Sequence, residues 1–445
     1  MTLLDRPRVN LYANTWREQL VICVSGFLGI LATNLLGPRI SLLFGSATGT
    51  LHSLAILVAA YQLQGWFPLF VVARVLDDIG KTVTRVCLVT LTLAYPREQK
   101  KARVLALFQF VVDMFLTLGQ VLKQNHGAQK GRDKEGAMGV AWARLLFTLL
   151  SSLCIFGVAP IGSVIRDSGV YVLARQTNSL RREFAKLTKV FRNKYMLLLM
   201  PYMFSYPFAL GVLGISFPNR QSVLFYNIGS LLAVAVAFVL DIGLKERRRR
   251  GQLGFAIITF VTLVCMISVT VLNTRYVDPN QLQIFENMRG APVNVYRLVH
   301  YRQLFYATVF LNGMSISSVF LFSGWVIGSL TNDAEYSARF TGALLSVPAL
   351  GTLTALLCLG ADETIPNVPA NSPLYVGIAL LTLSFVAMYY VVHSISDTNN
   401  WSLSSIRNST RGISNTVAVE HCCVVDYSDR FSISQSSIAK LPLPQ

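Results

Sequence analysis

Eleven apolar stretches, each about the length of a membrane-spanning helix, dominate this sequence. A helix needs roughly 20 mainly apolar residues to cross the hydrocarbon core of a bilayer. The stretches are too long and too uniformly apolar for barrel strands, which alternate between two faces over about ten residues. We therefore predict an all-α, multi-pass membrane protein with about 11 transmembrane helices. The stretches are 18–36, 43–63, 66–95, 103–123, 141–164, 194–215, 222–243, 252–272, 303–329, 338–359 and 374–393.

Composition and charge exclude other classes. Hydrophobic residues make up 53% of the 445 residues and charged residues only 14%, which is too apolar for an ordinary water-facing surface. The net charge of +17 would suit a nucleic acid, but no soluble module remains to carry a basic patch. We expect no nucleic-acid partner, and we expect the basic residues to mark membrane topology.

The distribution of Lys and Arg predicts that topology. Alternate loops place 23 basic residues on one side of the membrane and 12 on the other, and the rest lie within apolar stretches. Loops rich in Lys and Arg stay in the cytoplasm. We therefore predict that the loop Lys245–Arg250 and the C-terminal tail are cytoplasmic.

Loop length predicts the domain organisation. The longest connection on the basic side, 165–193, separates five stretches from six. We expect an N-terminal helical bundle (1–164), a basic cytoplasmic linker (165–193), a C-terminal helical bundle (194–393) and a disordered, Ser-rich cytoplasmic tail (394–445). Within the linker, Leu180–Phe191 has apolar residues at helical spacing among basic ones, which fits a helix on an anionic leaflet or a solvated linker helix.

Five segments together resemble a known family. They are GFLGILATNLLGPRISLLFGSA, LAYPREQKKARVLALF, IRDSGVYV with KYMLLLMPYMF, the arginine loop after FVLD, and GWVIGSLTNDAEYSARFTG. In this order they are similar to landmarks of the fungal Unc-ninety-three-like branch of the major facilitator superfamily, over roughly residues 16 to 400. The last motif is the most specific, and it contributes Trp325, Asn332, Asp333, Arg339 and Gly342.

The resemblance implies a two-bundle fold of twelve helices and solute transport by alternating access. It also implies members that regulate channels or traffic other proteins. Here the first apolar stretch already leads into Gly37–Pro38–Arg39, the turn expected after the second helix, so we expect one N-terminal helix of the twelve-helix plan to be missing. Either this protein is a shortened member of the family, or the gene model has lost an internal exon. Ile316 and Phe320 stand where the family has polar residues.

The third stretch carries five charges that cannot all face lipid. Arg74, Asp77, Asp78, Lys81 and Arg85 fall along one side of a helix, and a charge in hydrocarbon costs about 2.5–3.5 kcal/mol on insertion scales. Arg74 can pair with Asp77 or Asp78, and Asp78 can pair with Lys81. Arg85 is left to pair with Asp113 of the next stretch. These charges line a substrate pathway, or they lock one helix against its neighbour, or the stretch is foreign to the membrane domain.

Asp113 is our first candidate for a proton-coupling residue. It lies at the centre of its stretch, and an isolated carboxyl group in hydrocarbon favours its neutral form, so it can change charge during transport. Asn227 and Asn312 are weaker candidates for the same cavity, since asparagine also forms ordinary hydrogen bonds between membrane helices.

The leading functional hypothesis is a secondary transporter that moves a small solute, with protons as a candidate coupling ion, across the plasma membrane or an internal membrane. The alternative is a non-transporting adaptor or channel and trafficking regulator with a protein partner. We expect no enzyme, cofactor or metal site, because the sequence has no phosphate-binding loop, nucleophile elbow or His-Glu-x-x-His pair.

Overall fold

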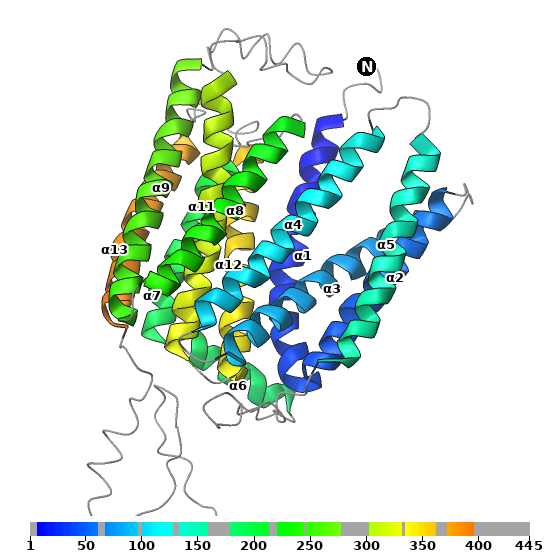
Figure 1. The fold of residues 1–445 in the computed structure, drawn as a ribbon, viewed down its shortest axis with the longest axis horizontal. Coiled ribbons are helices and arrows are strands. Elements are labelled where there is room, and N and C mark those ends of the chain that lie inside the picture. The colour runs from blue at the N-terminus through cyan, green and yellow to red at the C-terminus, as the bar shows by residue number, and fades with distance from the viewer. Residues whose placement is uncertain are drawn as a thin grey trace, which may run out of the picture. The chain divides into compact units, whose positions relative to one another are not determined.

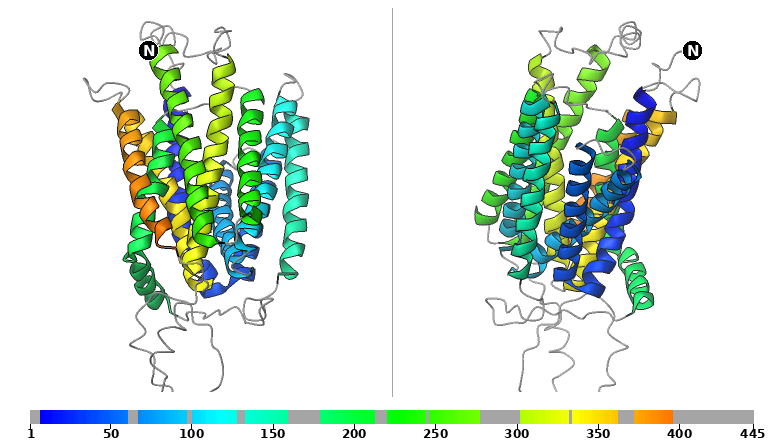
Figure 2. Two further views of the ribbon diagram at one scale, coloured as in Figure 1. Left: turned by 60° about the vertical axis from the view of Figure 1, so that its left-hand side comes forward. Right: turned by 90° about the vertical axis from the view of Figure 1, so that its right-hand side faces the viewer.

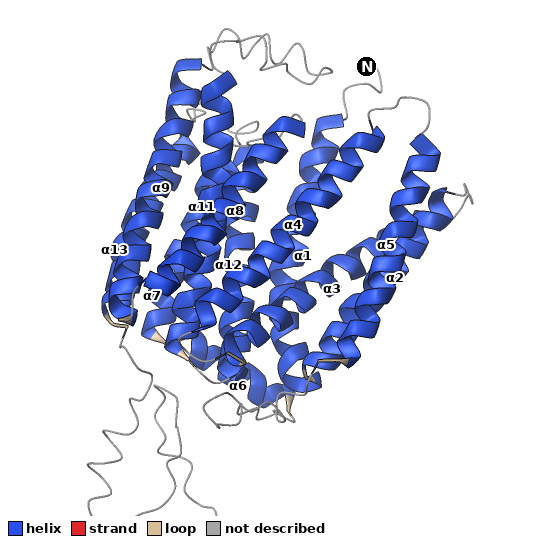
Figure 3. Ribbon diagram, viewed as in Figure 1, coloured by secondary structure: helices blue, strands red, loops and turns tan. Residues whose placement is uncertain are grey.

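Helices account for nearly all of the secondary structure in the described residues. The structure is a computed structural model that describes residues 7–60, 67–96, 100–127, 133–158, 179–212, 220–243, 246–276, 302–331, 334–361 and 372–395. These ranges contain no strand (Figure 3). The prediction of an all-α protein is confirmed.

Each predicted stretch corresponds to a long helix in the described ranges, and the predicted basic helix is present as α6. The elements are α1 (Pro7–Leu31), the π-helical turn η1 (Ala32–Leu36), α2 (Pro38–Ala60), α3 (Phe67–Ala94), α4 (Lys101–Gly127), α5 (Asp133–Phe156), α6 (Leu180–Phe191), α7 (Lys194–Val212), α8 (Arg220–Gly243), α9 (Arg247–Tyr276), α11 (Arg302–Leu330), α12 (Ala334–Ala361) and α13 (Ser372–His393).

Length and composition suit these helices to a bilayer. Among the described residues, seven helices are long and apolar enough to cross a membrane, and α5 and α8 hold shorter apolar segments. Helix α3 is 28 residues long and carries the five charges noted above. The chain is a multi-pass membrane protein.

The turn after the first helix is built on glycine. Gly37 has φ 82°, a left-handed conformation that costs glycine little and other residues more. Pro38 then begins α2, where its missing N–H is harmless, and the Arg39 Nε donates to the Val158 carbonyl at 2.6 Å. A turn is therefore present at Gly37–Pro38–Arg39, as expected from the sequence.

Several long helices that lie side by side are far apart in the sequence (Figures 1 and 2). Helix α2 packs between α3 and α5, α7 packs between α12 and α13, and α11 packs between α8 and α9. Helix α1 packs on α12, and α4 packs on α8. These last two contacts join the segments before and after the 165–193 linker.

Helix α6 lies against the ends of α7 and α12. It buries Glu183, Leu187 and Val190 and exposes Leu180 and Phe184. Neither sequence-based alternative for this helix included docking on the bundle. Residues 159–178, which include the start of the linker, and the tail from 396 onward lie outside the described residues.

Candidate functional site

A cavity of about 660 Å³ lies among α1, α3, α4, α7, α8, α11 and α12. Apolar side chains form much of its wall, but several polar ones project into it. The polar lining residues include Asp78, Lys81, Thr82, Arg85, Gln109, Tyr226, Asn312, Ser317 and Ser323. A polar, partly charged cavity in the middle of a membrane domain suits a water-soluble ligand, because charges at this depth are stable only when paired or solvated.

Asp113 is buried on α4 beside this cavity. Its carboxylate accepts a hydrogen bond from Gln109 Nε2 at 2.8 Å and another from the Ser230 hydroxyl of α8. Ser230 also contacts the Ser317 hydroxyl of α11. Because Gln109 and Ser317 both line the cavity, short hydrogen-bonded paths connect the carboxylate with it.

Arg85 reaches the same region from α3. Its guanidinium carbon lies 4.9 Å from the ring centroid of Phe320, a favourable cation–π geometry. The charges of Arg85 and Asp113 interact, as expected from the sequence. Tyr226 also interacts electrostatically with Arg85. In the described part of the chain Arg85 forms no salt bridge, so its charge is stabilised at longer range.

The five charges of α3 divide between two roles. Asp77 is buried between helices: its Oδ2 lies 2.7 Å from His52 Nδ1 on α2, 2.5 Å from Arg144 Nη2 on α5 and 2.6 Å from Lys81 Nζ. It therefore ties α2, α3 and α5 together.

The remaining α3 charges are more exposed. The expected Asp78–Lys81 pair is present at 3.4 Å, and both residues line the cavity with Arg85. Arg74 is also exposed, but it is not among the residues that line this cavity. Helix α3 thus carries charges that line the cavity and a charge that joins neighbouring helices.

The two asparagines also differ. Asn312 of α11 lines the cavity, and its buried Oδ1 has no hydrogen-bond partner among the described residues. Such an atom costs free energy unless a ligand or water satisfies it. Asn227 of α8 is buried but is not a lining residue.

On the side of residues 95–103 and 179–194, hereafter the basic side, two buried contacts join distant segments. Glu183 of α6 accepts hydrogen bonds from Arg339 of α12 at 2.7 and 2.8 Å and from Asn34 Nδ2 of η1 at 2.7 Å. Lys101 of α4 donates to the carbonyls of Gly328 and Thr331 at the end of α11, at 2.9 and 3.0 Å. These contacts close the bundle on the basic side.

Similar proteins give this arrangement its context. The sequence is 24% identical over 395 residues to UNC93-like protein 1 of Arabidopsis thaliana. The aligned region covers 85% of this chain and 82% of that protein. It is 21% identical over 341 residues to an UNC93-like protein of Schizosaccharomyces pombe, and this alignment covers 73% of the chain and 65% of the relative. No protein-family model matches the sequence.

A solved structure shows the same fold. The Escherichia coli fucose:proton symporter FucP superposes with a TM-score of 0.54 over 87% of this chain and 92% of its own, at 13% identity. The sequence thus resembles UNC93-like proteins, and the fold is that of a major facilitator transporter. The resemblance expected from the sequence segments is confirmed.

The most specific UNC93-like motif is distributed over several contacts. Trp325 stacks on Phe322 with ring centroids 5.8 Å apart, and Arg339 forms the ion pair with Glu183. Gly342 lies where α12 crosses α1, against Ile30. Asn332 and Asp333 lie outside the described residues. Sequence reasoning missed His52, Gln109, Glu183 and Ser230, whose importance depends on partners on other helices.

Proposed function

We propose that this UNC93-like protein is a secondary transporter that carries a small anionic or zwitterionic solute through the central cavity. The observation that carries the proposal is the position of Arg85. This guanidinium projects into a cavity at mid-membrane depth and has no salt bridge in the described part of the chain. Arginine binds carboxylates through two parallel hydrogen bonds. Arg85 therefore offers a binding site to a solute carboxylate, whereas apolar lipid chains could not form these bonds.

Alternating access would use the two predicted bundles, 1–164 and 194–393. Their contacts at α1–α12 and α4–α8 would act as the surfaces about which the bundles rock. The bundle is closed on the basic side, which we predict to be cytoplasmic, so the cavity would receive solute from the opposite side. Opening to the cytoplasm would then require Glu183 to leave Arg339 and Lys101 to leave the end of α11.

Asp113 is the proposed proton carrier. In the arrangement described, Gln109 and Ser230 donate hydrogen bonds to its carboxylate, which suits the ionised form. Protonation would remove the negative charge that balances Arg85 and so leave Arg85 to bind the solute carboxylate. A proton would accompany the anion, and coupling to protons is what the name of the fucose:proton symporter records for that protein.

The test is flux through purified protein in sealed vesicles that contain a pH-sensitive dye. A panel of amino acids and small hydroxycarboxylates is added outside the vesicles. Their amides, in which the carboxylate is replaced by an uncharged group, serve as controls. We expect at least one carboxylate, and not its amide, to move protons into the vesicles, and Arg85→Gln to abolish that signal. Absence of flux for the whole panel under every gradient, with a second membrane protein co-purifying in a fixed ratio, would support the adaptor alternative instead.

A further inference from the structure

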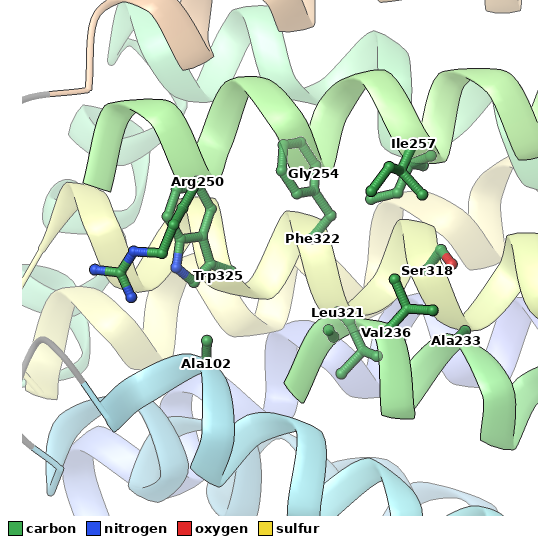
Figure 4. A pocket seen from close by; sticks show the side chains of 12 residues that line it. Ala102, Ala233, Val236, Arg250, Gly254, Ile257, Ser318, Leu321, Phe322 and Trp325 are labelled. Atoms are coloured by element: carbon green, nitrogen blue, oxygen red, sulfur yellow. The ribbon is translucent and has the colours of Figure 1, made fainter. Parts of the chain in front are cut away.

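A narrow apolar pocket lies between α8, α9 and α11, separate from the lining of the central cavity (Figure 4). Helices α8 and α9 both pack on α11 and make little contact with each other. The space between them therefore stays open. Its lining is almost entirely apolar and includes Ala233, Val236, Ala237, Ile257, Leu321 and Phe322.

Two residues with polar groups mark one end of this pocket. Arg250 and Trp325 lie together there, and Ile257 and Ala233 lie toward the other end (Figure 4). Arg250 is the last of the four consecutive arginines at the start of α9. Tryptophan is enriched where hydrocarbon meets lipid headgroups, so this end of the pocket lies at the depth of the headgroups on the basic side.

The neighbouring surface is suited to acyl chains. Phe238 of α8 and Leu253 and Phe260 of α9 are exposed apolar side chains in the part of the structure that crosses the membrane. Acyl chains would therefore lie against α8 and α9 beside the pocket. A water-soluble anion would find Arg250 but would gain nothing from the apolar walls.

We propose that this pocket binds one anionic phospholipid, with an acyl chain between α8 and α9 and the phosphate on Arg250. Basic residues next to a membrane helix attract anionic lipids, and basic pockets between helices bind their headgroups. The arginines at 247–249 would supply the general attraction, whereas Arg250 and the apolar slot would supply a specific site. This inference does not depend on which solute the central cavity carries.

Trp325 allows a direct test by fluorescence. The full-length protein keeps Trp325 as its single tryptophan, with Trp16, Trp66, Trp142 and Trp401 replaced by phenylalanine, and is reconstituted with brominated phosphatidylglycerol or brominated phosphatidylcholine. Bromine quenches tryptophan on contact. We expect phosphatidylglycerol to be preferred, and Arg250→Gln to lower that preference about fivefold, the factor expected for one basic residue near an anionic surface.

Arg249→Gln is the matched control, because Arg249 belongs to the same run and bonds Glu246 at 2.7 Å in an exposed pair. It should lower the preference by less than Arg250→Gln does, because Glu246 already offsets the charge of Arg249. A second pair of variants tests the slot: Ala237→Phe fills it, whereas Ala235→Phe adds the same ring on an exposed part of α8. Only Ala237→Phe should reduce quenching by phosphatidylglycerol. Equal losses in Arg249→Gln and Arg250→Gln, or equal effects of the two phenylalanines, would show surface attraction alone and overturn the proposal.

Discussion

The carboxylate of Glu183 and the guanidinium of Arg339 form a two-point ion pair at 2.7 and 2.8 Å, and both side chains are completely buried. A buried pair gains little net stability, since desolvation of two charges offsets their attraction. Its loss is nevertheless costly, because one charge is left alone. A contact with these properties between α6 and α12 suits a conformational switch. The pair holds the two helices together while the bundle is closed, and water can replace its hydrogen bonds when the bundle opens.

Glu183→Gln should strongly destabilise the protein. The variant removes the carboxylate that the buried Arg339 contacts, and removal of one member of a buried pair costs about 3–5 kcal/mol. Thermal unfolding in detergent measures the effect as a fall in melting temperature. Glu246→Gln is the control, because its pair with Arg249 is exposed and such pairs contribute about 0–1 kcal/mol. Equal melting temperatures for the two variants would contradict a structural role for the buried pair.

The sequence predicted the helices well because hydropathy is a local property. The stretch 303–329 corresponds to α11 at Arg302–Leu330, and the periodic segment Leu180–Phe191 corresponds to α6 without a shift. The sequence did not predict the contacts of Glu183 or His52, which are made with residues on other helices. With 22 acidic and 39 basic residues, charge alone does not select Arg339 as the partner of Glu183, because that choice depends on how α6 docks.

The charges on α3 show the same limit. Spacing placed all five on one side of a helix, and Asp78 and Lys81 pair as their spacing predicted. Asp77, one position earlier on the helix, also contacts Lys81, and in addition it meets His52 and Arg144 on neighbouring helices. A difference of one residue rotates a side chain by about 100° on a helix, which is enough to turn it from the cavity to a neighbouring helix.

Adjacent aspartates on α3 should therefore respond differently to the same substitution. Asp77→Asn removes the charge that Lys81 and Arg144 share, so we expect reduced melting temperature and poor yield of folded protein. Asp78→Asn changes only a pair that faces the cavity, so the protein should fold normally while the affinity for solute or the flux changes. Size-exclusion chromatography and thermal unfolding of both variants provide the comparison. Normal folding of Asp77→Asn would assign Asp77 to the pathway instead of the helix lock.

The crossing of α8 and α11 should tolerate no side chain at Gly313. A Cβ added there would lie 1.9 Å from the Tyr226 carbonyl oxygen, a backbone atom that cannot rotate away. Gly313→Ala should destabilise the protein by about 1–3 kcal/mol through overpacking. Gly119→Ala on α4 is the matched control, because a Cβ there has no atom within 4 Å, and alanine favours the helix by up to about 1 kcal/mol. A similar melting temperature for both would mean that α8 and α11 do not approach this closely.

Asp113→Asn separates proton coupling from solute binding. Asparagine preserves the size of the side chain and removes its titration, so we expect normal insertion, loss of pH-driven flux and retention of solute exchange at equal pH. Uptake that depends on pH to the same extent in wild type and variant would refute the assignment. If Asp113→Asn fails to express, its charge is needed to balance Arg85, and Asp113→Asn with Arg85→Gln should then restore folding. Transport should remain absent in that double variant, because the proton carrier and the proposed anion site are both gone.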